Sequence, residues 1–370
     1  MLSPKTKRNL YRILPFGIIW LLSGWVFLIV ENAAAVSAER LPSTVIQVDF
    51  KIFIFSSLAI AGVGLLVGTI ELVYLHDAFA KKSFTKKILY KLLIYTLALS
   101  LIILITYPIA ASMDLNASIF DSRVWDRYFQ FLASMTHLST MVQLGTALGA
   151  SLFYAEISEN IGHGILLNFF AGKYHQPTEE ERIFMFLDMK SSTTIAEQLG
   201  HIRYFELLKE YYAGLSDAIV EYEGEVYQYV GDEIVISWPY QAGIRNSNCL
   251  RCFFAMKEGL RKRAGWYRKK FGVAPTFKAG LHFGKVTTGE IGVLKREIIF
   301  TGDVLNATAR IQGLCNAYET DLLLSGDLAQ NLDLGTEFEA RPLGQSELRG
   351  RKEEVELYTV LPPGRADNNP

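Results

Sequence analysis

Two aspartates in the second half of the chain stand where carboxylates can bind a metal ion. Asp188 follows a short apolar run at 183–187 that indicates a buried strand. Asp232 follows Gly231 between two further strand patterns at 225–230 and 233–238, and a Gly-Asp pair in that position predicts a hairpin turn. Taken singly, each is better explained as an ordinary turn residue. If the first strand lies beside the hairpin, however, both carboxylates reach one point, where a divalent cation would relieve their repulsion.

The elements around these aspartates predict how they are positioned. Helical periodicity is present at 201–222, 245–271 and 304–318, and further strand patterns occupy 276–283, 285–291 and 298–301. The order β-α-β-β-α-β with additions predicts an α+β, ferredoxin-like domain, an antiparallel sheet with helices on one face. In this topology the first strand and the hairpin lie side by side at the centre of the sheet. We place this domain at 182–362 and a flexible tail at 363–370.

Four separated motifs resemble the catalytic domain of class III adenylate and guanylate cyclases. They are FLDMKSST at 186–193, YVGDE at 229–233, GLHFG at 280–284 with Gly289 beyond it, and TGDVLNATAR at 301–310. They occur in the family's order and spacing, and the resemblance covers nearly all of residues 182–360. It implies a nucleotidyl cyclase, a phosphorus-oxygen lyase that makes a cyclic nucleotide from a nucleoside triphosphate.

The resemblance implies roles for particular residues. Asp188 and Asp232 would bind two Mg²⁺ or Mn²⁺ ions, with the carbonyl of Met189 completing a metal site. The turn after Asp188, formed by Ser191, Ser192 and Thr193, would begin a helix. The main-chain amides at the N-terminus of that helix could bind a triphosphate.

Three further residues match positions that the family uses around the ribose and the phosphates. Asn306 would orient the ribose, and Arg310 would neutralise charge on the α-phosphate in the transition state. Arg349 lies in LRG at 348–350, where the family often carries a phosphate-binding lysine. Arginine keeps the positive charge but not the geometry of lysine.

Base choice is where the sequence departs from the pattern. Adenine-selecting members carry a lysine and an aspartate or threonine at the positions of Gln228 and Ile299, and the guanine-selecting glutamate and cysteine are also absent. A glutamine amide can read either base, whereas isoleucine can only pack. We favour ATP as substrate, because the arrangement of a membrane domain followed by one cyclase domain resembles bacterial adenylate cyclases. The alternatives are a guanylate cyclase that makes cyclic GMP from GTP, and a catalytically inactive, nucleotide-binding membrane receptor.

The family arrangement also implies a homodimer. In class III cyclases the metal-binding aspartates come from one subunit and the Asn/Arg pair from the other. This chain carries one copy of each set, so two copies would form two equivalent sites. Nucleic acid is not expected as a partner, because the net charge of −1 provides no large basic field.

Apolar residues are concentrated in the first 155 residues and predict a membrane domain. Four stretches, at 13–30, 52–75, 92–111 and 129–154, have the length of about 20 residues that crosses a bilayer. The sequence therefore predicts an α-helical bundle of four spans at 1–155, embedded in the lipid bilayer, and a short cytosolic linker at 156–181.

Lysine and arginine gather before the first span and between the second and third. This distribution predicts that both termini and the catalytic domain lie in the cytosol. The resemblance to bacterial adenylate cyclases implies that the membrane is the bacterial inner (plasma) membrane. Glu71, near the cytosolic end of the second span, is interpreted as reaching the interface. His137 lies within the fourth stretch, where a ligand role and a helix-packing hydrogen bond both stay open.

Overall fold

The computed structural model describes residues 3–37, 49–75, 84–161, 172–294, 297–347 and 354–362. The chain divides into two compact units, one formed by Thr6–Leu167 and the other containing Asn168–Pro370. Arg349 and the tail at 363–370 lie outside the described residues, as does part of the linker expected at 156–181.

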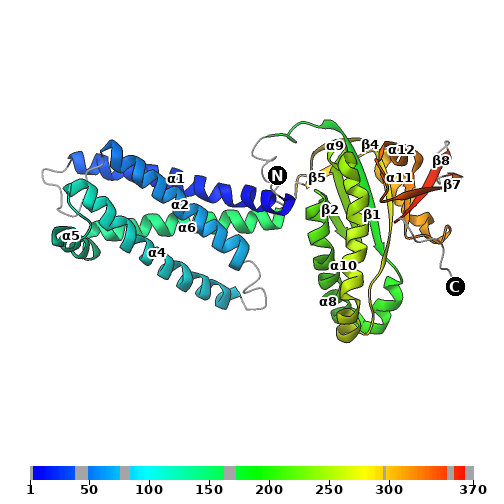
Figure 1. Ribbon diagram of the computed structural model, residues 1–370, viewed down its shortest axis with the longest axis horizontal. Helices are drawn as coiled ribbons and strands as arrows, with labels where there is room; N and C mark the ends of the chain where they lie inside the picture. Colours follow the sequence, from blue (N-terminus) through cyan, green and yellow to red (C-terminus); the bar gives the residue numbers. More distant parts are fainter. Residues whose placement is uncertain are drawn as a thin grey trace. The chain divides into compact units, whose positions relative to one another are not determined.

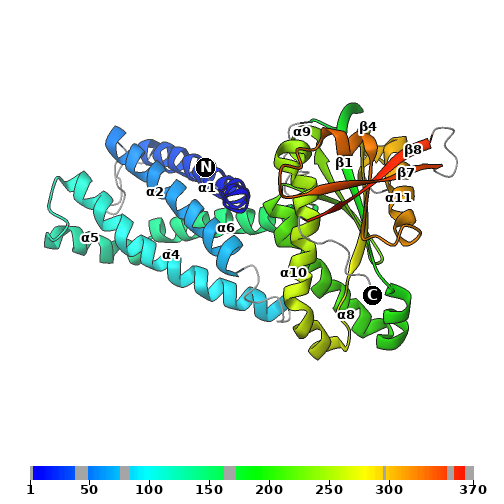
Figure 2. The same ribbon diagram turned by 45° about the vertical axis from the view of Figure 1, so that its right-hand side comes forward.

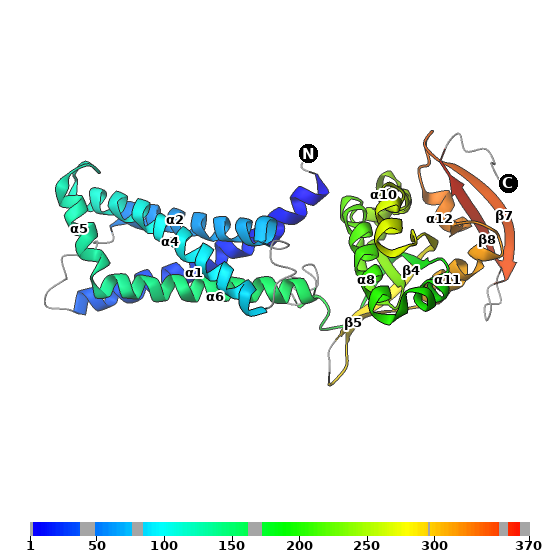
Figure 3. The ribbon, with the colours of Figure 1, turned by 90° about the horizontal axis from the view of Figure 1, so that it is seen from below.

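The first unit is helical. Its described elements are α1 (Pro4–Ser37), α2 (Phe50–Thr69), the π-helical η1 (Ile70–Leu75), α4 (Phe84–Leu115), α5 (Ser122–Leu132) and α6 (Met135–Ile161). The long helices run side by side, and the short α5 lies across one end of them (Figures 1 and 3). Among the described residues, three segments are long and apolar enough to cross a membrane: Pro4–Glu31, Phe50–Leu75 and Leu93–Leu115. Such helices fit a membrane anchor.

The stretch at 129–154 is not one continuous helix, as the sequence had suggested. The chain leaves the helical conformation at Ala133, after α5, and α6 begins at Met135. Ser134 produces the new start, since its hydroxyl accepts a hydrogen bond from the main-chain N–H of His137 at 3.2 Å. The helix α6 is not among the three apolar segments of the described chain, because residues such as Thr140 and Gln143 dilute its apolar run. A fourth span through α6 stays a prediction.

Glu71 does not reach for the interface, so that interpretation was wrong. Its side chain is buried in η1, where it forms an ion pair with Lys91 of α4. It also accepts a hydrogen bond of 2.6 Å from the hydroxyl of Tyr95, a fully buried residue. Satisfying the carboxylate inside the bundle avoids the cost of an unpaired charge in an apolar surrounding.

His137 lies in the first turn of α6. Its ring meets the Phe131 ring edge-on, with centroids 5.1 Å apart, and its Nδ1 is buried without a hydrogen-bond partner in the described chain. The packing hydrogen bond considered for this side chain is therefore not made through Nδ1.

The second unit is built on one mixed sheet. Within the described residues it has eight strands in the order β2-β3-β1-β4-β6-β8-β7, with β5 paired to β4. The strands are β1 (Thr178–Met189), β2 (Glu225–Val230), β3 (Glu233–Pro239), β4 (Phe277–Ile291), β5 (Glu297–Thr301), β6 (Leu322–Ser325), β7 (Glu339–Glu347) and β8 (Glu354–Leu361). The hairpin of β7 and β8 forms the far end of the sheet (Figure 2). The pair β4–β6 is parallel, so the sheet is not purely antiparallel as expected.

Helices cover both faces of this sheet rather than one. The helices are α8 (Ser192–Glu221), α9 (Tyr240–Ile244), α10 (Asn248–Phe271), α11 (Asp303–Gly313) and α12 (Gly326–Asn331), with short 3₁₀ turns η2 (Arg245–Ser247) and η3 (Leu314–Asn316). On one face, Met185 and Leu187 of β1 join the core formed by α8 and α10, which lie side by side (Figures 1 and 2). On the other face, Phe184 and Phe186 pack with Val304 of α11. Because successive side chains of β1 point to opposite faces of the sheet, this strand contributes residues to two hydrophobic cores.

Three local differences from the sequence-based elements affect the site. The strand β4 is continuous through Gly284, where two strands were expected. The helix α8 starts at Ser192 rather than at 201, and its only non-helical residue is Gly200, with φ 70° and ψ 163°. The expected helix 304–318 ends at Gly313 and continues as η3.

Candidate functional site

The fold brings Asp188 and Asp232 together, as the sequence predicted. Strand β1 lies between β3 and β4, and Leu187 pairs with Ile234 at the end of the β2–β3 hairpin. Gly231 forms the turn with a left-handed φ of 63°, a conformation that side chains with a Cβ rarely adopt. The carboxyls of Asp188 and Asp232 lie close enough to share a hydrogen bond.

The electrostatics of this pair fit a cation. Partial burial, followed by the hydrogen bond to Asp232 and the charge of that residue, raises the pKa of Asp188 to about 6. Burial, Asp188 and Asp232 also raise the pKa of Glu233. The Oδ2 atom of Asp232 is buried and has no hydrogen-bond partner in the described chain. A divalent ion would satisfy that oxygen and relieve the repulsion.

The donor set in the described chain is small. No group of three or more His, Cys, Asp or Glu side chains that could hold a metal is present there. Among the described residues the structure thus brings together the two carboxylates, and Met189, whose carbonyl is the third expected ligand, is the last residue of β1. Such a sparse set suits Mg²⁺ or Mn²⁺ completed by water and phosphate oxygens rather than a closed structural site.

A lysine that the sequence analysis missed stands beside the pair. Lys278 of β4 lies opposite Asp188 in the strand register, and its Nζ is 3.8 Å from Asp188 Oδ2. Its side chain is only 13% exposed, so water screens the interaction weakly. The only sequence signal for this lysine is its position two residues before Gly280 in an expected strand. Its place opposite Asp188 can be recognised only when the register of the two strands is known.

The turn that follows Asp188 starts α8 at largely exposed residues. Ser191 has a left-handed φ of 57° and starts α8 without a side-chain cap, and Ser191 and Thr193 are exposed while Ser192 is half-buried. Uncapped amides at the start of a long helix suit an anion such as a phosphate. The neighbouring Lys190 is directed to an ion pair with Asp321.

Asn306 and Arg310 are not brought to the aspartates. Their helix, α11, buries Val304, Ala307, Thr308 and Ile311 against the sheet, whereas Asn306 is exposed and Arg310 half-buried. Within the described part of the chain, neither side chain forms a hydrogen bond or ion pair with Asp188 or Asp232. One copy of the chain therefore does not gather the whole predicted set.

The two predicted base-selecting positions lie on strands that do not pair with each other, since β2 pairs with β3 and β5 pairs with β4. Gln228 is exposed on β2, next to a bulge, and Ile299 is half-buried on β5. Their neighbours Tyr227 and Phe300 tie the strands together, with ring centroids 4.8 Å apart and a 3.3 Å hydrogen bond from the Phe300 N–H to the Tyr227 hydroxyl. Arg349 cannot be placed, because it lies outside the described residues.

Comparison with known families agrees with this geometry. Residues 174–362 match the adenylate and guanylate cyclase catalytic domain. The chain belongs to this cyclase family. The match begins just before β1 and runs through β8, so it contains both aspartates, the turn before α8 and all of α11.

Two curated cyclases of Rhizobium meliloti (strain 1021) are among the relatives. Adenylate cyclase 2 is 34% identical over 228 residues, which cover 62% of this chain and 63% of that protein. Adenylate cyclase 1 is 27% identical over 215 residues, which cover 57% of this chain and 31% of that protein. The chain thus spans less than two thirds of the length of either.

A solved bacterial light-regulated adenylyl cyclase shares the fold. It is 21% identical, with a TM-score of 0.51, and the likeness covers 60% of this chain and 64% of the other. At this identity the likeness concerns the fold alone.

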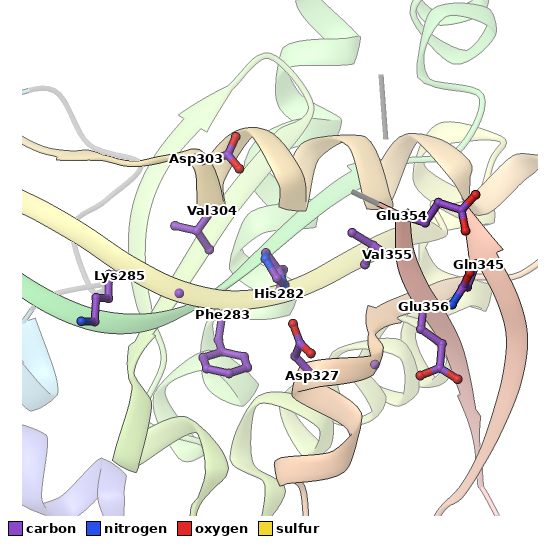
Figure 4. A pocket seen from close by; sticks show the side chains of 12 residues that line it. His282, Phe283, Lys285, Asp303, Val304, Asp327, Gln345, Glu354, Val355 and Glu356 are labelled. Atoms are coloured by element: carbon purple, nitrogen blue, oxygen red, sulfur yellow. The ribbon is translucent and has the colours of Figure 1, made fainter. Parts of the chain in front are cut away.

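The cyclase domain also contains a pocket away from the aspartate pair. It has a volume of about 460 Å³ and is lined by residues of β4, α11, α12 and the β7–β8 hairpin (Figure 4). The carboxylates of Asp303, Asp327, Glu354 and Glu356 line it, which disfavours a triphosphate. His282, in its wall, is 6% exposed and hydrogen-bonds through Nδ1 to the Ser325 hydroxyl at 2.8 Å, as a packed residue would.

Proposed function

We propose that this protein is a membrane-bound adenylate cyclase that converts ATP to 3′,5′-cyclic AMP and pyrophosphate. The observation that carries the proposal is the close pair Asp188 and Asp232, with one carboxylate oxygen buried and unsatisfied within the described chain. Family membership supplies the reaction class, and the curated relatives named adenylate cyclase favour ATP.

The chain's own residues would position the nucleotide. The carboxylates of Asp188 and Asp232 and the Met189 carbonyl would hold two Mg²⁺ or Mn²⁺ ions, and the amides around Ser191, Ser192 and Thr193 would receive the triphosphate. When bound, these ions would supply charge stabilisation and lower the pKa of the 3′-hydroxyl, whose proton passes to water. The 3′-oxygen then bonds to the α-phosphorus as the bond from that phosphorus to the bridging oxygen breaks, and pyrophosphate leaves with the electron pair.

A second copy of the chain would complete each site. Asn306 and Arg310 face away from their own sheet and make no contact with their own aspartates among the described residues. We infer that they act on the nucleotide held by the partner, where Asn306 orients the ribose and Arg310 stabilises the charge on the α-phosphate. The protein is then a homodimer with two equivalent sites. If Arg349 contributes, it does so at the phosphates.

The apolar helices of the first unit support placement in the plasma membrane. The excess of lysine and arginine in the first turns of α1, ahead of the apolar stretch at 13–30, and around 81–91 favours cytosolic termini, and a cytosolic catalytic domain has direct access to ATP. The four-span arrangement, with α6 as the last span, is part of this proposal. Membrane attachment would also raise the effective concentration of the two catalytic domains for each other.

The deciding experiment incubates the purified full chain with ATP and, separately, with GTP in the presence of Mn²⁺, and resolves the cyclic products by chromatography. We expect cyclic AMP to exceed cyclic GMP. Equal or greater formation of cyclic GMP would instead favour the guanylate cyclase alternative, which the exposed Gln228 amide permits.

Asp188→Ala and Asp232→Ala should each abolish turnover in this assay. The matched control is Asp327→Ala, which removes an exposed carboxylate in the same domain away from the pair. Full activity in either metal-site variant would refute the assignment. No product from the unmodified chain, together with retained nucleotide binding, would favour the inactive receptor.

A further inference from the structure

The turn that carries Asp232 stands at an open edge of the sheet. Strand β2 is the end strand of the sheet order, and Tyr229 and Val230, the last residues before the turn, are 52% and 54% exposed. The last paired residues are Val230 and Glu233, so only Gly231 and Asp232 lie beyond the ladder. An edge turn of this kind has few neighbours to fix its position.

A tyrosine from α8 holds this turn from the side. The Tyr212 hydroxyl donates a 2.7 Å hydrogen bond to the main-chain carbonyl of Gly231, and the Glu233 carbonyl is 3.5 Å from the same hydroxyl. The Tyr212 ring also packs on that of Tyr229, with centroids 4.5 Å apart. One side chain thus contacts the residues on both sides of Asp232.

The carboxyl of Asp232 depends on its backbone for its placement. Its Oδ2 is buried and accepts no hydrogen bond within the described chain. Apart from the close approach of the two carboxyls, the position of that oxygen relative to Asp188 is therefore set by the main chain of the turn. A shift of the turn by a fraction of an ångström would misplace a metal ligand.

We propose that Tyr212 is a positioning residue for the aspartate pair. By fixing the carbonyls that flank Asp232, it holds the turn in the geometry in which both carboxylates can serve one cation site. This inference rests on the proposed metal-binding role of Asp188 and Asp232, and it extends the functional site from the first turn of α8 to the middle of that helix.

The same domain offers a matched control. The Tyr267 hydroxyl of α10 donates a 2.8 Å hydrogen bond to the main-chain carbonyl of Glu210 in α8. It is the same kind of bond, from a phenol to a peptide carbonyl between two elements, but it does not touch the hairpin. Tyr267→Phe therefore measures the loss of such a bond without the positioning effect.

The test measures Mn²⁺ binding by the purified full chain, using electron paramagnetic resonance of the free ion, without nucleotide. We expect Tyr212→Phe to raise the Kd for Mn²⁺ about fivefold, the effect of one hydrogen bond, and Tyr267→Phe to leave it within about twofold. The Mn²⁺ concentration needed for half-maximal cyclase activity should rise with Tyr212→Phe, with a smaller change in kcat at saturating Mn²⁺.

Two further variants keep the outcome decisive. Tyr229→Leu removes the ring against Tyr212 at an exposed position, and we expect a smaller rise in Kd in the same direction. Unchanged Mn²⁺ affinity in Tyr212→Phe, or an equal rise in Tyr267→Phe, would overturn the inference. Asp232→Ala separates the two proposals: if it loses Mn²⁺ binding while Tyr212→Phe does not, only the role of Tyr212 fails, and if it keeps Mn²⁺ binding, the metal site itself fails.

Discussion

At the residue scale, the aspartate pair is arranged for binding rather than for stability. Two carboxyls share a hydrogen bond, and burial together with Asp232 raises the pKa of Asp188 to about 6, above its ordinary value of 3.8. A carboxyl whose pKa is raised by folding binds its proton more tightly in the folded than in the unfolded chain. The metal-free fold therefore gains stability as the pH falls from about 6 to about 4, and it lacks that gain at neutral pH.

Asp188→Asn should therefore stabilise the metal-free protein while removing its activity. The neutral amide carries no charge to bury, so we expect a gain of about 1 kcal/mol at pH 7.5, a value that allows for the partial exposure of the side chain. The thermal midpoint of the chelator-treated protein, measured between about pH 4 and about pH 8, checks this. The variant should also lose most of the stability gain on acidification, and an unchanged pH profile would contradict the assignment.

At the element scale, α11 approaches the sheet closely because Gly280 has no side chain. A Cβ at Gly280 would lie 2.4 Å from the main-chain nitrogen of Gln312, a contact that only a shift of the helix could relieve. Gly280, in the motif GLHFG, thus sets the distance between the sheet and α11, the helix that carries Asn306 and Arg310.

Gly280→Ala should lower both stability and turnover. Moving a packed helix typically costs about 1–3 kcal/mol, and the shift would displace Asn306 and Arg310. Gly313→Ala, at the end of the same helix, is the control, since a Cβ there would meet no atom of the described chain within 4 Å. Thermal unfolding and kcat of the two variants test the expectation, and equal kcat in both would speak against a role for the close approach.

In the helical first unit, the π-helical turn η1 places Glu71 beside Lys91 and Tyr95 of α4. Breaking a buried ion pair leaves one charge without compensation, which costs more than removing both partners. We expect Lys91→Met to destabilise the detergent-solubilised protein by about 3 kcal/mol, and the double variant Glu71→Gln with Lys91→Met to recover most of that loss. Additive losses, measured by thermal unfolding, would mean that the pair is not coupled.

These elements differ in how far the sequence could predict them. Strand β2 and the Gly231 turn follow directly from alternation and turn chemistry, and the pairing of β1 with the hairpin follows from topology. The parallel β4–β6 contact, the role of Lys278 and the inward direction of Glu71 depend on register and long-range packing, which single-sequence patterns do not contain. The break before α6 has a local cause in Ser134, yet the surrounding apolar residues concealed it.

At the scale of the whole molecule, the described part of one chain brings Asp188 and Asp232 together but does not bring Asn306 and Arg310 to them. Co-expression of Asp188→Ala chains with Arg310→Ala chains should therefore restore activity, because each mixed dimer contains one site with an intact set. We expect about a quarter of the unmodified activity from random pairing. Cyclic nucleotide formation in membranes from cells expressing either variant alone provides the baseline, and no recovery on mixing would argue against a shared interface.

The non-helical residue Gly200 divides α8 into two helical segments that contact different parts of the proposed site. The first segment begins at the turn expected to meet the triphosphate. The second carries Tyr212, whose hydroxyl hydrogen-bonds to the hairpin of Asp232. Because Gly200 lies outside the helical φ/ψ region, we expect the first segment to adjust its direction independently of the second. Contacts made at the triphosphate turn should then leave the hydrogen bond between Tyr212 and the hairpin unchanged.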